Sequence, residues 1–181
     1  MRQLERAIAY LARFAGAVGG VLTLSCVALV GYAVGMRYLL GQPEPWTDKV
    51  AGWLVVGVVM LASPEAQRRF EHIGVDIARN RLGPRMVRVV HLIGTLSVTL
   101  VAALLLQAGI EMVEFSRMVG IMTDLEGVPV WWIQALMPVG ATLLLLVAAC
   151  QSLLLLMGAE PAHLPAQDND EMPRDPLARA E

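Results

Sequence analysis

The fold is decided by residues 37–76, which read RYLLGQPEPWTDKVAGWLVVGVVMLASPEAQRRFEHIGVD. The central part of this stretch, residues 50–62, carries no charged side chain. An apolar run of only about 10–14 residues can be re-entrant or interfacial. A helix counted from Trp46 to Ala66 has about 20 residues, which is enough to cross a hydrocarbon core of about 30 Å. Arg68 and Arg69 would then reach the far interface.

The distribution of arginines also favours a crossing at residues 46–66. Without it, the arginines that follow would lie on the side opposite the N-terminus, against the preference for positive charge in the cytoplasm. A crossing places them with the N-terminal arginines. We therefore predict that Pro45 precedes the helix, that Thr47 or Asp48 caps it and that Pro64 kinks or ends it. The arginines concerned are Arg68, Arg69, Arg79, Arg81, Arg85 and Arg88, with Arg2, Arg6 and Arg13 before the first span.

Composition places the whole chain in the same class. Of its 181 residues, 56% are hydrophobic and 17% are charged, whereas soluble domains have about 45–50% and about 25%. The excess lies in long runs, which is typical of a polytopic helical membrane protein. The net charge of −2 gives no basic field for nucleic acid, so we expect no nucleic-acid partner. Cys26 and Cys150 lie in apolar runs and have no ligand or disulfide spacing.

Three further runs complete the predicted fold, an all-α membrane protein with four transmembrane helices and both termini in the cytoplasm. The spans are predicted at residues 14–36, 46–66, 87–113 and 131–157, within a membrane domain of residues 1–158. Residues 159–181 are rich in proline and acids and are predicted to be a disordered cytoplasmic tail. Five glycines of the first span suit close helix packing: Gly16, Gly19, Gly20, Gly31 and Gly35.

The central thirds of these runs contain no Asp, Glu, Lys, Arg or His. An ion-coupled carrier usually keeps an ionisable group inside the bilayer, so we expect no substrate site or proton relay in this chain. Charges at the span ends serve either as interface anchors or as contacts with another membrane subunit. Gln107, Glu111 and Glu114 share one helical face near the outer end of the third span, where we expect them at the interface.

Four features, in order along the chain, resemble a known family. The first spans the exit of the first helix and the entrance of the second: Arg37, Tyr38, Gly41, Pro45, Trp46 and Asp48. The second is Trp53, in the first turns of the second span. The third is in the inner loop: His72, Ile73, Val75 and Asp76, then Pro84 and Arg85. The fourth opens the last span: Gly127, Pro129, Trp131, Pro138 and Gly140.

Through this series the chain resembles, over about residues 35–145, the small membrane subunit (DctQ type) of tripartite ATP-independent periplasmic (TRAP) transporters. It departs from the family at Asp48–Lys49, where members often have two adjacent acids. The resemblance implies a small permease subunit of a cation-gradient-driven symporter in the bacterial inner membrane. A large membrane subunit would bind the coupling ion, expected to be sodium, and an organic acid such as a dicarboxylate or sialic acid.

The resemblance also implies the partners. A periplasmic substrate-binding protein would deliver the substrate, and the small subunit would brace the large one in the lipid bilayer without a cofactor or catalytic residue. Arg37 and Asp48 would face the periplasm, and Trp53 would contact the large subunit. Trp46 would do the same or anchor in lipid headgroups. The candidate subunit-interface or motif positions are Arg37, Pro45, Trp46, Asp48, Trp53, His72, Asp76, Pro129, Trp131 and Pro138.

Two alternatives are disfavoured by specific features. A self-contained small multidrug-type exporter needs a membrane-embedded acid, usually in its first span, and residues 14–36 contain none. A membrane anchor of a redox enzyme would need axial haem ligands inside the bundle, and among the histidines only His91 is near enough. No nucleophile-and-base set or phosphate-binding loop stands out, so we do not expect an enzyme.

Overall fold

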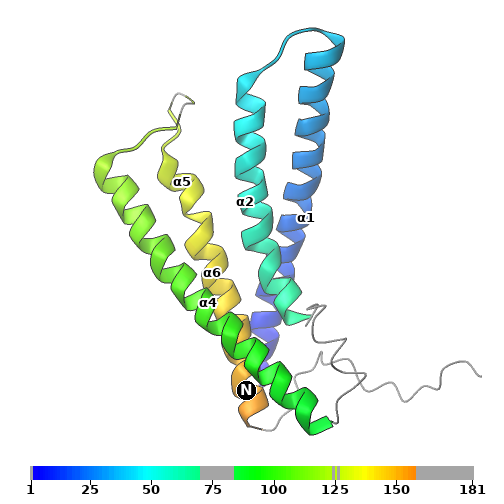
Figure 1. Cartoon of the computed structure of the whole chain (residues 1–181), viewed down its shortest axis with the longest axis vertical. Helices are drawn as coiled ribbons and strands as arrows, with labels where there is room; N and C mark the ends of the chain where they lie inside the picture. Colours follow the sequence, from blue (N-terminus) through cyan, green and yellow to red (C-terminus); the bar gives the residue numbers. More distant parts are fainter. Residues whose placement is uncertain (1, 70–83, 124, 126, 158–181) are drawn as a thin grey trace, which may run out of the picture.

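The computed structural model describes residues 2–69, 84–123, 125 and 127–157. Four segments of these ranges are long and apolar enough to cross a membrane, and the described residues form no strand beyond the isolated bridge between Met122 and Pro129. The predicted all-α class with four membrane spans is therefore confirmed. The helices are α1 (Arg2–Leu39), α2 (Pro45–Arg68), α4 (Pro84–Val119), α5 (Val130–Gln134) and α6 (Leu136–Leu156) (Figure 1).

The helices are longer than the spans predicted within them. Helix α1 has 38 residues, which is about 57 Å at about 1.5 Å per residue, and it continues without a break through residues 2–13. Hydropathy marks only the part of a helix that suits lipid, so the parts beyond the hydrocarbon core were not predicted. The inner-loop positions His72 and Asp76, and the tail of residues 159–181, lie outside the described residues.

The two prolines within helices act differently. Helix α2 continues past Pro64 to Arg68, so it does not end at this proline. The fourth span is divided at Ala135 into α5 and α6. Pro138 has no N–H to donate to the carbonyl of Gln134, whereas the neighbouring backbone bond from Val139 N to Ala135 O is present at 3.3 Å. Loss of this one helical hydrogen bond explains the division.

The helices form two antiparallel hairpins that converge at one end and diverge at the other (Figure 1). Helix α1 packs on α2, α4 packs on α5 and α6, and the main contact between the hairpins is that of α2 with α6. We call the divergent end the loop end, because residues 40–44 and the described part of residues 120–129 connect the helices there. The opposite end, where α2 and α6 finish and α1 and α4 begin, is called the terminal end.

The hairpins approach each other most closely at Gly140 of α6. A β-carbon at this glycine would lie 2.5 Å from the carbonyl oxygen of Met60 in α2 and 2.6 Å from the Met60 Cβ. That carbonyl lacks its usual helical donor because residue 64 is a proline, and the Ser63 hydroxyl donates to it at 3.3 Å. Gly140 therefore fits where a larger residue would force the helices apart.

Other glycines bring helices together within each hairpin. A β-carbon at Gly109 of α4 would lie 3.1 Å from Pro138 Cδ in α6. On α1, Gly16 and Gly19 face Glu65 and Ala62 of α2: a β-carbon at Gly16 would lie 3.0 Å from Glu65 Cβ, and one at Gly19 would lie 3.4 Å from Ala62 N. A β-carbon at the other three glycines of the first span would meet no atom of the described chain within 4 Å, so these glycines do not bring helices of this bundle together: Gly20, Gly31 and Gly35.

A buried pair of glutamines joins the hairpins near the terminal end. Gln67 Nε2 donates to Gln151 Oε1 at 2.8 Å, and Gln151 Nε2 donates to the carbonyls of Gln67 and Arg68 at 3.1 and 3.3 Å. The two residues are only 1% and 6% exposed. Side-chain amides that bond across helices stabilise a bundle in lipid, where apolar contact gives little preference for one partner. This pair fixes how α2 and α6 are rotated against each other.

Charged side chains also cluster at the end of α2. Arg68 donates to the two oxygens of Glu65 at 2.6 Å each, and Arg69 donates to one of them at 2.8 Å. Glu65 thus pairs with both arginines at the end of α2. Because Arg68 is only 8% exposed, its bidentate bond to the carboxylate offsets the loss of water around both groups.

We predict that Gly140→Ala destabilises the chain by about 1–3 kcal/mol, because the added methyl group would overlap the Met60 carbonyl. The matched control is Gly20→Ala on α1, where no atom lies within 4 Å and the change should stay within about 0.5 kcal/mol. Thermal unfolding of both variants in detergent micelles measures the difference. Equal melting temperatures would show that the Gly140 contact is not limiting.

Candidate functional site

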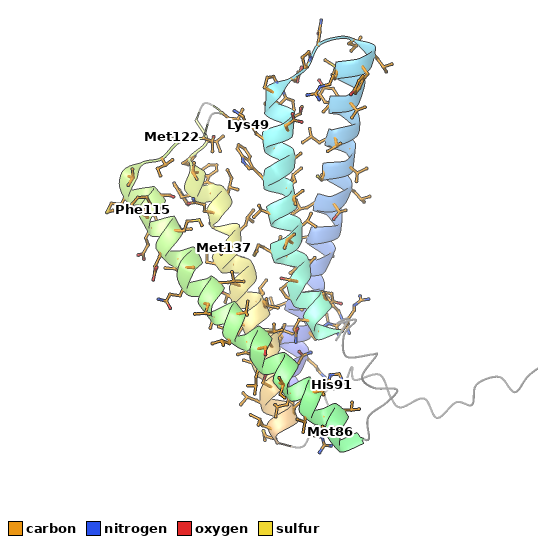
Figure 2. All side chains as sticks on the ribbon, viewed as in Figure 1. Lys49, Met86, His91, Phe115, Met122 and Met137 are labelled. Carbon is orange, nitrogen blue, oxygen red and sulfur yellow. The ribbon has the colours of Figure 1, made fainter. Side chains whose placement is uncertain are left out.

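An open cleft of about 490 Å³ separates the hairpins at the loop end. Lys49 on α2 and Met122, which follows α4, lie on its two sides (Figure 2). One wall is the start of α2, and the other is α5 with the first part of the loop that follows α4. We call this the loop-end cleft; its lining is Asp48, Lys49, Gly52, Trp53, Met122, Thr123, Val130, Ile133 and Gln134.

The first three turns of α2 present two of the predicted positions to this cleft, Asp48 in the first turn and Trp53 in the third. Pro45 is the first helical residue rather than the residue before the helix, and Glu44 is the N-cap without a side-chain cap bond. The prediction that Thr47 or Asp48 caps the helix is therefore wrong. Thr47 lies inside the first turn, where its hydroxyl donates back to the Glu44 carbonyl at 2.7 Å.

Trp46 lies at the outer edge of the same turn and is 40% exposed. Its indole N–H donates to the Glu44 carboxylate, and its ring centroid lies 6.5 Å from that of Tyr32 on α1. The ring is thus held by both helices of the first hairpin while much of its surface remains accessible. This geometry suits either of the two predicted roles of Trp46, contact with a partner or anchoring in headgroups.

Arg37 and Asp48 face each other across the first hairpin. Arg37 Nη2 lies 3.8 Å from Asp48 Oδ2, and the side chains are 57% and 73% exposed. A pair this exposed contributes little to stability. Its carboxylate and guanidinium remain accessible to a partner.

The opposite wall is held by a structured loop between α4 and α5. Thr123 N donates to the Val128 carbonyl at 2.9 Å, and the Thr123 hydroxyl contacts the same oxygen at 2.8 Å. Val130 N donates to the Ile121 carbonyl at 3.1 Å, beside the bridge between Met122 and Pro129. Pro129, one of the predicted positions, is the N-cap of α5. The loop therefore has a defined shape at the rim of the cleft.

Trp131 connects this loop to the end of α4. The Arg117 guanidinium carbon lies 5.1 Å from the centroid of the Trp131 ring, and Trp132 packs edge-on against that ring at 5.9 Å. Tryptophan and arginine side chains of this kind gather at the membrane–water interface. These two tryptophans, which we call the aromatic belt, thus have a cationic neighbour from α4.

The structure brings together some of the predicted positions and separates others. Asp48 and Trp53 line the cleft, with Arg37 beside Asp48. Pro129 and Trp131 belong to α5 and its N-cap, in the wall opposite α2. Pro138 lies farther along the fourth span, in α6, against Gly109 of α4.

Sequence reasoning missed Gln134, whose buried Oε1 lines the cleft wall without a hydrogen-bond partner. It also missed the Gln67–Gln151 pair. A search for amides as well as charges within the apolar runs would have found all three.

The chemistry available at this site is that of binding. Among the described residues, no group of three or more His, Cys, Asp and Glu side chains is placed to hold a metal ion. The cleft offers aromatic and aliphatic surface with opposite charges at its mouth, which suits contact with another protein.

The fold and the site define a multi-pass helical membrane protein whose polar groups lie mainly at the ends of its helices. A family model described as tripartite ATP-independent periplasmic transporters, DctQ component, matches residues 26–158. This is well over half of the chain, and the chain therefore belongs to the DctQ family of transporter components. No curated protein matches the chain at a significant level.

We predict that Arg37→Gln changes the free energy of unfolding by less than about 1 kcal/mol, because the pair with Asp48 is exposed and 3.8 Å long. Thermal unfolding of the purified chain gives this value. A drop of many degrees in the melting temperature would instead show that Arg37 holds the hairpin together. With stability unchanged, any loss of transport in this variant reports on partner contact.

Proposed function

We propose that the chain is the small permease subunit of a TRAP-type symporter in the bacterial inner membrane, and that it braces the large membrane subunit during uptake of an organic acid. The substrate, a dicarboxylate or sialic acid in this proposal, and the coupling ion, sodium, bind in the large subunit. Membership of the DctQ family supports the role of transporter component. The finer assignments rest on the arrangement of polar groups in this chain.

The observation that carries the proposal is the interior of the bundle. Where a carrier would bind its substrate, α2 and α6 meet through Gly140 and the Met60 backbone. The polar interior groups nearby are amides and hydroxyls: the pair Gln67–Gln151 joins the hairpins, and the contact of Thr99 with Ser152 at 3.3 Å joins α4 and α6 within the second hairpin. These groups bond to one another and hold the helices together. Such an interior supports bracing rather than transport by this chain alone.

The loop end is proposed to face the periplasm and the terminal end the cytoplasm. The arginines near the start of α1, the end of α2 and the start of α4 support this orientation through the preference for positive charge inside. The loop-end cleft would then open on the side from which a substrate-binding protein approaches. Its accessible neighbours Arg37 and Asp48 would contribute to that approach, and Trp53 to contact with the large subunit.

Deletion of this chain should abolish high-affinity uptake by cells that retain the large subunit and the binding protein. The large subunit should also co-purify with the tagged chain in mild detergent. Uptake of radiolabelled substrate and mass spectrometry of the purified complex measure these outcomes. Full uptake without the chain would refute the proposed function.

Trp53→Ala should lower both the recovery of the large subunit and uptake by about tenfold, because buried tryptophans dominate protein contacts. Trp132→Ala is the matched control: Trp132 is 58% exposed and does not line the cleft. Unchanged complex yield and uptake in the Trp53 variant would remove Trp53 from the subunit contact.

A further inference from the structure

The side of α4 that faces away from the bundle carries a regular series of exposed residues. Successive members are separated by alternating steps of four and three residues, and each is exposed. This spacing is the one by which a nearly parallel helix packs knobs into holes. We call the series the α4 seam: Ile93, Ser97, Leu100, Leu104, Gln107, Glu111, Glu114 and Met118.

The seam lies opposite the surface by which α4 packs within the bundle. Ala102 is fully buried and Gly109 lies against Pro138 of α6. Glu111 follows Ala102 by nine residues, which is two and a half turns at 3.6 residues per turn. The two residues therefore lie on opposite sides of the helix. Figure 1 shows α4 at the outside of the second hairpin. A partner helix could therefore reach the seam without disturbing the bundle.

Two polar members of the seam lie within the membrane rather than beyond it. The stacked pair of Arg117 and Trp131 marks the interface at the loop end. Glu111 precedes Arg117 by six residues, or about 9 Å along the helix, and Gln107 precedes it by ten, or about 15 Å. Both are thus nearer the membrane centre than the aromatic belt. We infer from this that both lie deeper than the interface position predicted from the sequence.

These polar side chains are unsuited to contact with lipid. Gln107 Nε2 donates to Glu111 Oε1 at 3.0 Å, and both residues are exposed. A carboxylate has two acceptor oxygens, so this one bond leaves acceptor capacity directed away from the bundle. The exposed membrane face of α1 differs, because it presents apolar residues such as Leu24 and Val27, at 73% and 67% exposure. The α1 face therefore suits lipid, whereas the α4 seam suits a polar partner.

We propose that a transmembrane helix of the large membrane subunit packs on the α4 seam and presents a basic side chain to Glu111. This inference rests on the proposed function and names the contact surface. A helix is indicated because a membrane-spanning segment of a bundle protein is helical, and a cation by the carboxylates of Glu111 and Glu114, which are the two charged members of the seam. A second copy of this chain is a poor occupant, because a twofold contact between identical seams would bring like carboxylates together.

The first test places a photoactivatable benzophenone amino acid at Leu104, in the middle of the seam, and at Leu24 on α1 as the control. Both leucines are exposed, at 59% and 73%. In membranes that contain the whole transporter, the probe at position 104 should cross-link to the large subunit, and the probe at position 24 should not. A cross-link from position 104 to a second copy of the chain, or none to protein, would overturn the inference.

The second test removes the negative charge of Glu111. Glu111→Leu should lower the large subunit retained on the tagged chain by about tenfold in mild detergent, with Glu111→Gln intermediate. The isolated variant chains should keep the wild-type melting temperature, because Glu111 faces away from the bundle. Equal retention by Glu111→Leu and the wild type would refute the seam contact. Failure of the wild-type chain to retain any large subunit would instead refute the proposed function.

Discussion

The contact of Gly140 with the Met60 carbonyl sets the distance between the two hairpins, and the rest of the arrangement depends on it. Pro64 removes the helical donor of that carbonyl, and the glycine leaves room for α6 to approach it. The Gln67–Gln151 bonds, nearer the terminal end, fix the rotation of the same two helices. With the hairpins joined there, they separate toward the loop end, and the cleft between Trp53 and Met122 follows from this divergence.

This arrangement follows from the solvent in which the protein folds. Lipid chains are as apolar as leucine, so burial of apolar side chains does little to choose one helix pair over another. Close backbone approach and hydrogen bonds between helices make the choice instead. Gly16 and Gly19 serve the first hairpin, Gly109 with Pro138 serves the second, and Gly140 with the glutamine pair joins them. Most of the specificity of the fold is therefore carried by few residues.

The number and class of the helices could be predicted from sequence because length and hydropathy decide whether a segment crosses a membrane. The partners of individual glycines could not, since they depend on the rotation of each helix. Gly16 and Gly31 both lie in the apolar run of the first span, yet only Gly16 faces α2. The start of α2 was placed one residue late because Pro45 suits the first helical position as well as the position before it.

The candidate site was predicted in part for a similar reason. Asp48 and Trp53 belong to one short segment, so their proximity follows from sequence. The opposite wall of the cleft, with Met122, Thr123 and Gln134, comes from a segment distant in sequence. Its residues could be identified only from the structure. The depth of Glu111 in the membrane could not be predicted from sequence alone, because it depends on where Trp131 meets α4.

The polar groups of this bundle have the distribution expected of a subunit that supports another membrane protein. A carrier directs its membrane-embedded charges inward, toward a cavity that holds its substrate. Here the exposed carboxylate of Glu111 is directed away from the bundle, and the amides within it bond to each other. A carboxylate in this position is costly in lipid but favourable beside a cation on a second protein. The outward position of Glu111 therefore gives the chain a reason to associate with another protein.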